Sequence, residues 1–140
     1  MFTQTLRHGL AALCAAVAMT GVIVGTASAA GPGPAQDQCR LEPKVLFSLS
    51  DPIGRVFGIG TVVCANPQYE ITVGVVLTQG SAIVGSGRNV CQGQAQCSVT
   101  VPATDPAGIQ TWCATATGTY QISPEGPVFD LGSKKICAQG

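Results

Sequence analysis

The sequence predicts an all-β protein, a small β-sandwich or barrel held together by disulfide bonds. Three observations lead to this prediction: short segments of alternating apolar and polar residues, turns rich in glycine and proline between them, and an even number of cysteines once an N-terminal export signal is set aside. The chain has 140 residues, so it holds at most one domain. Beyond the export signal, no stretch has the apolar spacing of a helix.

The first 29 residues have the features of an export signal. A short positive region precedes the apolar residues 10–24, and Ala27-Ser28-Ala29 matches a small-residue cleavage site. Cleavage there would leave a flexible leader at residues 30–38, rich in Gly, Pro and Gln, and a β-domain at residues 39–140. We therefore expect a secreted, extracellular protein whose mature form has no membrane anchor.

The clearest strand runs from Tyr69 to Leu77, where odd-numbered residues are apolar and even-numbered residues are mostly polar. Further strands are expected at residues 44–50, 56–64, 97–101 and 110–119, and within 128–137. Turn-forming residues separate the strands at positions 51–54, 66–67, 85–87, 105–108 and 124–127. Within the second strand, Gly58 and Gly60 predict either a bulge or a strand covered on both sides.

The cysteines predict three disulfide bonds. The chain has seven, of which Cys14 lies in the signal, and an even set in an exported chain favours complete pairing. Residues opposed across a hairpin are equidistant from its turn. Three local pairs are each centred on a turn: Cys39 with Cys64, Cys91 with Cys97, and Cys113 with Cys137. The rival scheme joins Cys64 to Cys113 across two sheets.

The last hairpin offers a check on this pairing. If Cys113 opposes Cys137, then Thr115 opposes Lys135 on a polar face. The other face then collects the apolar residues of the hairpin, which are Trp112, Ala114, Ala116 and Ile136. The pattern therefore supports the local pairing.

Composition argues against several classes of function. Seven Lys and Arg balance seven Asp and Glu without a run of either sign, which gives no electrostatic reason to bind nucleic acid or an anionic membrane. The single histidine, His8, lies in the signal, so the mature chain lacks the commonest general base and zinc ligand. Two carboxylates could converge as in a glycosidase, but Asp51, Asp105 and Glu125 sit in turns, where Asp caps the backbone, and Glu70 lies on an exposed strand face. We expect no enzyme, no cofactor and no metal.

Two features are candidates for binding. The segment Gln92, Gly93, Gln94, Ala95 and Gln96 lies between Cys91 and Cys97, and a loop pinned by its own disulfide loses little entropy when it binds. Thr111, Thr115, Thr117 and Thr119 also place hydroxyl groups along one strand face, although the β-propensity of threonine explains such a row without function.

A resemblance to known proteins rests on two segments that follow the export signal. Val62-Val63-Cys64-Ala65-Asn66-Pro67 and Gln110-Thr111-Trp112-Cys113-Ala114-Thr115-Ala116-Thr117 resemble small, mostly uncharacterised secreted proteins of actinobacteria. The stretch from Asp105 to Cys113 is similar to the start of strand F in immunoglobulin-like domains, except that Thr111 stands where their corner tyrosine would be. The resemblance implies an immunoglobulin-like β-sandwich, with a small Greek-key barrel as the alternative. It implies no active site.

Together these observations predict a secreted, non-catalytic binding or structural protein. Its partner is expected to be an extracellular protein, an envelope component or a small ligand of unknown identity, not a nucleic acid or a membrane. The alternative is a secreted inhibitor of proteases or other hydrolases that presents either the disulfide-pinned residues 92–96 or the turn at residues 123–128 as a rigid insert.

Overall fold

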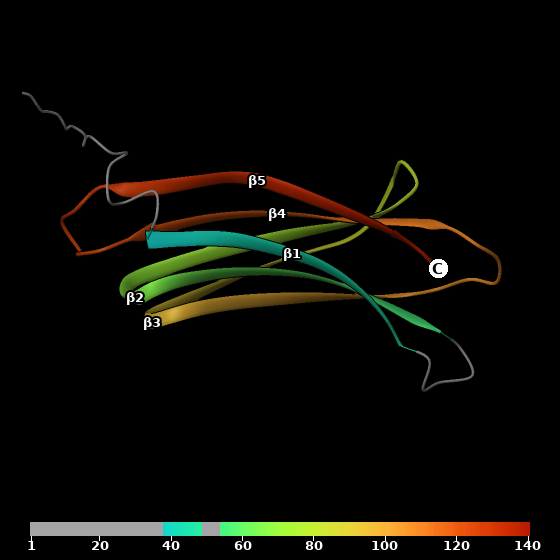
Figure 1. Ribbon diagram of the computed structural model, residues 1–140, viewed down its shortest axis with the longest axis horizontal. Helices are drawn as coiled ribbons and strands as arrows, with labels where there is room; N and C mark the ends of the chain where they lie inside the picture. The colour runs from blue at the N-terminus through green and yellow to red at the C-terminus, as the bar shows by residue number, and fades with distance from the viewer. Residues whose placement is uncertain (1–37, 49–53) are drawn as a thin grey trace, which may run out of the picture. The chain divides into compact units, whose positions relative to one another are not determined.

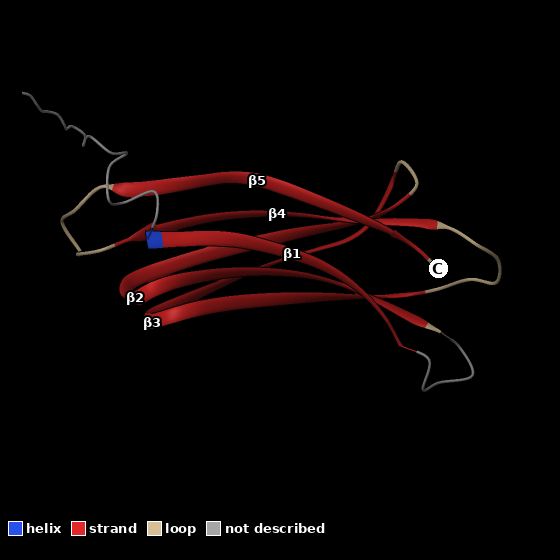
Figure 2. Ribbon diagram, viewed as in Figure 1, coloured by secondary structure: helices blue, strands red, loops and turns tan. Residues whose placement is uncertain are grey.

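The structure, a computed structural model, describes residues 38–48 and 54–140. Its five strands are β1 (Cys39–Ser48), β2 (Arg55–Gln79), β3 (Ala82–Thr104), β4 (Thr111–Gln121) and β5 (Val128–Gln139) (Figures 1 and 2). The all-β class is therefore confirmed. The predicted export signal, nearly all of the predicted leader and the predicted turn at Asp51-Pro52-Ile53 lie outside the described residues.

All five strands belong to one antiparallel sheet with the order β1-β2-β4-β5, and β3 also pairs with β2. The long strand β2 is central: its first half pairs with β1, its second half pairs with β4, and β3 follows it along almost its whole length. An immunoglobulin sandwich divides its strands between two sheets, so the immunoglobulin-like detail of the prediction is not confirmed.

The ribbon formed by β2 and β3 bends back on itself, and this bend curls the sheet into a half-barrel with two facing layers. The bend coincides with the shift in pairing between Val63 and Gln68, at the end of the sheet where the labels β2 and β3 stand in Figure 1. Proline cannot donate to a strand ladder, so Asn66-Pro67 favours an interruption here. The predicted turn at these two residues is thus a bend inside β2.

We call the part formed by β1, the first half of β2 and the second half of β3 the first layer. The second layer consists of the first half of β3, the second half of β2, β4 and β5. Glycines allow the layers to approach closely: a Cβ atom added to Gly60 would lie 3.1 Å from the carbonyl oxygen of Gly74, and one at Gly58 would lie 3.0 Å from Leu77 Cδ1. Gly58 and Gly60 therefore mark a strand covered by the other layer, not a bulge.

The predicted turn at Gly85-Ser86-Gly87 is wrong, because these residues lie inside β3 and pair with β2. The glycine at position 85 serves packing: an added Cβ would lie 2.6 Å from Val101 Cγ1 in the facing layer. The actual turn between β2 and β3 is Gly80-Ser81, where Gly80 has a φ of 58°. Glycine adopts this left-handed conformation without steric cost.

The core lies between the two layers. Ile71, Val73, Val75 and Leu77 are at most 2% exposed, as the alternation in this strand predicts. Tyr69, expected on the same face, is instead 42% exposed, whereas its neighbour Gln68 is 2% exposed. The irregular pairing at the bend interrupts the alternation at this point.

The three predicted disulfide bonds are confirmed, and they exclude the rival bridge between Cys64 and Cys113. Cys39 and Cys113 lie directly opposite their partners across neighbouring strands, with Cα–Cα distances of 3.9 and 4.1 Å. The Cys91–Cys97 bond spans the bend of β3. Three disulfides within one small chain are typical of extracellular proteins.

The predicted register of the last hairpin is also confirmed, since Thr115 opposes Lys135. Trp112, Ala114 and Ala116 are fully buried, but Ile136 is 45% exposed. The prediction for Ile136 fails because β5 is an edge strand: it pairs with β4 alone and meets β1 without hydrogen-bonded pairing. A side chain on the inner face of such an edge is only partly covered.

Candidate functional site

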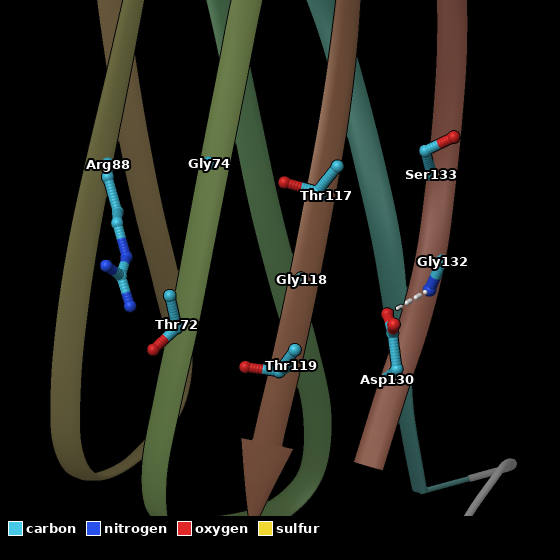
Figure 3. A pocket seen from close by; sticks show the side chains of 9 residues that line it. All are labelled: Thr72, Gly74, Arg88, Thr117, Gly118, Thr119, Asp130, Gly132 and Ser133. Carbon is cyan, nitrogen blue, oxygen red and sulfur yellow. Dashed lines mark hydrogen bonds between the residues drawn. The ribbon is translucent and has the colours of Figure 1, made fainter. Parts of the chain in front are cut away.

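The outer face of the second layer carries an open groove of about 500 Å³ that crosses all four of its strands (Figure 3). Nine residues line it: Thr72, Gly74, Arg88, Thr117, Gly118, Thr119, Asp130, Gly132 and Ser133. Six of them carry polar or charged side chains and three are glycines. The groove is thus a polar surface whose floor is partly bare backbone.

Strand register creates the hollow. Gly74 pairs with Arg88 on one side and with Thr117 on the other, and Thr117 pairs in turn with Ser133. Directly opposed residues share a face of the sheet, so these four positions form one row across four strands. Gly74 has no side chain, and an added Cβ would lie 3.0 Å from Thr117 Oγ1. The row is therefore open at its centre.

A second row beside the first contains Thr72, Thr119 and Asp130. The pairing of β4 with β5 shifts between Thr117 and Thr119, and Gly132 near this irregularity has a φ of 72°. Here the backbone N–H of Gly132 donates a 2.8 Å hydrogen bond to Asp130 Oδ1. This bond holds the carboxylate of Asp130 at the β5 end of the groove (Figure 3).

The groove combines donors and acceptors in a small area. The hydroxyl groups of Thr117 and Thr119 both point toward β2 in Figure 3. A threonine hydroxyl both donates and accepts, whereas a guanidinium only donates and a carboxylate only accepts. The side chain of Arg88 makes no hydrogen bond or ion pair with the other described residues, so its donors are available to a ligand. Such a surface suits a ligand rich in hydroxyl groups.

The predicted threonine row lies on the outer face of β4, but only part of it enters the groove. Thr117 and Thr119 line the groove, whereas Thr115 and Thr111 lie beyond it. Thr72, Gly74, Arg88 and Asp130 were missed by sequence reasoning. Thr72 is a polar position of the Tyr69–Leu77 strand, so its place on the outer face could have been predicted. Which residues of other strands lie beside it depends on the strand order, which cannot be read from the sequence.

The predicted binding loop Gln92, Gly93, Gln94, Ala95 and Gln96 lies at the bend of β3 and does not line the groove. Its backbone is paired with β2, with Gln94 opposite Gln68 and Gln92 opposite Glu70. The side chain of Gln92 also donates a 3.3 Å hydrogen bond to Glu70 Oε2. The segment is therefore a part of β3 that is bridged by a disulfide bond and exposes its side chains, not a protruding hairpin tip.

Three carboxylates of the described strands and loops each accept a hydrogen bond from a different group. Asp105 accepts a hydrogen bond from Trp112, Glu70 from Gln92, and Asp130 from the Gly132 backbone. Within residues 38–48 and 54–140, no group of three His, Cys, Asp or Glu side chains is placed to hold a metal ion. In the same part of the chain, no helix is long and apolar enough to span a membrane.

Comparison with known proteins gives structural likenesses but no family. No family model matches the chain, and no curated protein matches it. A crystal structure of a protein from Archaeoglobus fulgidus is similar to 70% of this chain and 97% of its own, with 11% sequence identity and a TM-score of 0.31. The expected resemblance to secreted actinobacterial proteins stays a prediction.

Proposed function

We propose that this protein is a secreted, non-catalytic binding protein that holds a hydroxyl-rich component of the cell envelope in the groove on its second layer. One observation carries the proposal: the row Arg88–Gly74–Thr117 places an available guanidinium and a threonine hydroxyl on either side of a position without a side chain. The three disulfides support an extracellular location, because such bonds persist in oxidising compartments.

The chemistry of the groove favours a saccharide or a similar polyol. Sugar hydroxyls both donate and accept, so they match the threonines, while Arg88 and Asp130 add a donor and an acceptor near opposite ends. No aromatic residue lines the groove, so recognition rests on hydrogen bonds and not on ring stacking. A sheet that is rigid before binding loses little conformational entropy.

Titration of the ¹⁵N-labelled, oxidised protein with a panel of neutral, N-acetylated and carboxylated oligosaccharides tests this function. The expected result is a saturable chemical-shift change confined to amides near residues 72–74, 117–119 and 130–133. The variant Gly74→Val fills the centre of the groove and should abolish the change, because its side chain occupies the space beside Thr117 Oγ1.

The matched control is Thr100→Val, which adds a valine at an exposed position of the first layer, away from the groove. It should bind as the unaltered protein does. Shifts centred on any other surface, or undiminished binding by Gly74→Val, would overturn the proposal.

The second candidate function is inhibition of an extracellular protease. The observation that favours it is the Cys91–Cys97 bond, which straps the exposed side chains of Gln92, Gln94 and Gln96 at the bend. Stoichiometric inhibition of a serine-protease panel, lost in Gln94→Pro or after cleavage of the segment, would support this function. An inhibitor that acts equally well after either change would argue against it.

A further inference from the structure

The cationic side chains of this protein gather at one side of the folded sheet. The described residues contain six Arg and Lys side chains, and four of them, Arg40, Lys44, Lys134 and Lys135, lie on the edge strands β1 and β5 where these two come into contact. We call these four residues the basic edge. The overall balance of seven positive and seven negative residues conceals this concentration of charge.

Local geometry brings the basic edge together. Arg40, Glu42 and Lys44 alternate along β1, so they share one face of it. On β5, Lys134 and Ile136 pair with the buried residues Ala116 and Ala114, which places both on the inner face of an edge strand, toward β1. Between the two strands lies a groove of about 380 Å³, lined by Glu42, Pro43, Lys44, Lys134, Lys135 and Ile136.

One carboxylate lies within this cluster. The Nε of Arg40 donates a 2.7 Å hydrogen bond to Glu42 Oε1. This bond, followed by the positive charges of Arg40, Lys44 and Lys134, holds the pKa of Glu42 below its usual range, so Glu42 is ionised at neutral pH. Three of the four cations of the basic edge thus act on Glu42, and among the described residues of this cluster the surface keeps an excess of positive charge.

We propose that the basic edge binds an extended polyanion, a linear glycan or related envelope polymer with repeated carboxylate or phosphate groups. Arg40 and Lys44 are four residues apart, roughly 13 Å along a strand, and Lys134 and Lys135 lie on the other strand. A small anion can contact only part of this array, whereas an extended chain can follow the groove past its three lysines and reach Arg40 along β1. Such attraction between opposite charges on exposed groups weakens as salt concentration rises.

This site is separate from the hydroxyl-lined groove and does not depend on the function proposed for it. The test is fluorescence anisotropy of the oxidised protein with labelled polygalacturonate, which carries carboxylates, and with labelled polyphosphate, each at low and high salt. Binding to either polymer should weaken with salt, and the preferred polymer identifies the source of the anionic groups.

Two variants should change the affinity for the polymers in opposite directions. The double variant Lys44→Gln with Lys134→Gln removes one groove-lining lysine from each of the two strands, and it should weaken binding by about tenfold. Glu42→Gln removes the carboxylate that Arg40 binds in this cluster and should strengthen binding several-fold. A variant that merely damaged the fold could not produce this gain in affinity.

The matched control is Arg55→Gln, which removes a cation at the start of β2, outside both grooves, and should leave the affinity for both polymers unchanged. Binding that is independent of salt, or equal losses in Arg55→Gln and the double variant, would overturn the proposal. So would tighter binding to double-stranded DNA or to anionic phosphatidylglycerol vesicles than to either polymer.

Discussion

The indole Nε1 of Trp112 donates a 3.2 Å hydrogen bond to Oδ1 of Asp105. Trp112 is fully buried near the start of β4, whereas Asp105 lies in the loop between β3 and β4. The backbone N–H of Asp105 donates a further hydrogen bond, of 3.0 Å, to the carbonyl oxygen of Gly54 at the start of β2. Asp105 thus joins a surface loop to the core and to the facing layer.

Replacement of Asp105 by alanine should lower the free energy of unfolding by about 1–3 kcal/mol, because the buried indole N–H of Trp112 would lose its partner. Asp105→Asn keeps an oxygen acceptor in the same place and should cost less. Urea unfolding followed by Trp112 fluorescence measures both. Equal stability of Asp105→Ala and the unaltered protein would show that the hydrogen bond contributes nothing.

Gly118→Val should destabilise the protein by about 1–3 kcal/mol through overpacking. A Cβ atom at this position would lie 2.6 Å from Val62 Cγ2 in the first layer. Gly74→Val makes the same exchange on the outer face of the neighbouring strand and should change stability far less. Thermal unfolding of the two variants checks the contrast, and an equal loss in both would refute the packing argument.

Tyr120→Phe should leave the protein at least as stable at neutral pH, because the hydroxyl of Tyr120 is buried without a hydrogen-bond partner among the described residues. The stacking of its ring on Phe129, with centroids 5.1 Å apart, is kept. Chemical unfolding near pH 7 measures this effect. A clear loss of stability would mean that the hydroxyl has a partner after all.

The same residue predicts a dependence on alkaline pH. Burial raises the pKa of Tyr120 above its ordinary value of 10.0. The unfolded chain therefore releases this proton at lower pH than the folded protein, and stability present below pH 10.0 should fall as the pH rises past that value. Tyr120→Phe should lessen the fall. Tyr69→Phe is the control, because Tyr69 is 42% exposed and its loss should leave the profile unchanged.

The three disulfide bonds should differ in how much they stabilise the folded protein. Sequence separations of 25 and 24 for Cys39–Cys64 and Cys113–Cys137 correspond to about 3 kcal/mol each in the chain-entropy model, more than for the Cys91–Cys97 bond with its separation of 6. Paired replacement of the cysteines by alanine measures these contributions. Similar melting temperatures with and without reductant would contradict the predicted stabilisation.

Under mild reduction, the Cys113–Cys137 bond should open before Cys39–Cys64. Cys137 is exposed, whereas Cys39 and Cys64 are 4% and 7% exposed within the core. A reductant must reach a sulfur atom to break the bond. Alkylation of the free thiols followed by peptide mass mapping reveals the order in which the bonds open. Labelling of Cys39 before Cys137 would contradict the prediction.

Much of the fold could be predicted because its signals are local. Alternation along Ile71–Leu77 indicates one buried face, and the distance of each cysteine from a turn indicates its partner. Reasoning of this kind fails where a residue has a second role. Gly85 looks like a turn residue but is a contact point between layers, and Asn66-Pro67 bends a strand that continues beyond it.

The candidate sites could not be predicted in the same way. Thr72, Arg88, Thr117 and Asp130 come from four strands, and only their lateral order and register place them around one groove. The basic edge likewise combines residues more than 80 positions apart along a chain without net charge. Neither surface leaves a local pattern, because cross-strand neighbours are set by pairing and not by spacing.

The amino-acid sequence by itself determined the all-β class and the three disulfide pairings, because alternation, turn chemistry and hairpin symmetry act over short stretches of chain. Tertiary structure decided that β2 and β3 fold back together, that a glycine opens the groove beside Arg88, and that four cations meet at the edge between β1 and β5. These features depend on which strands lie side by side, and the packing of one layer against the other determines that arrangement.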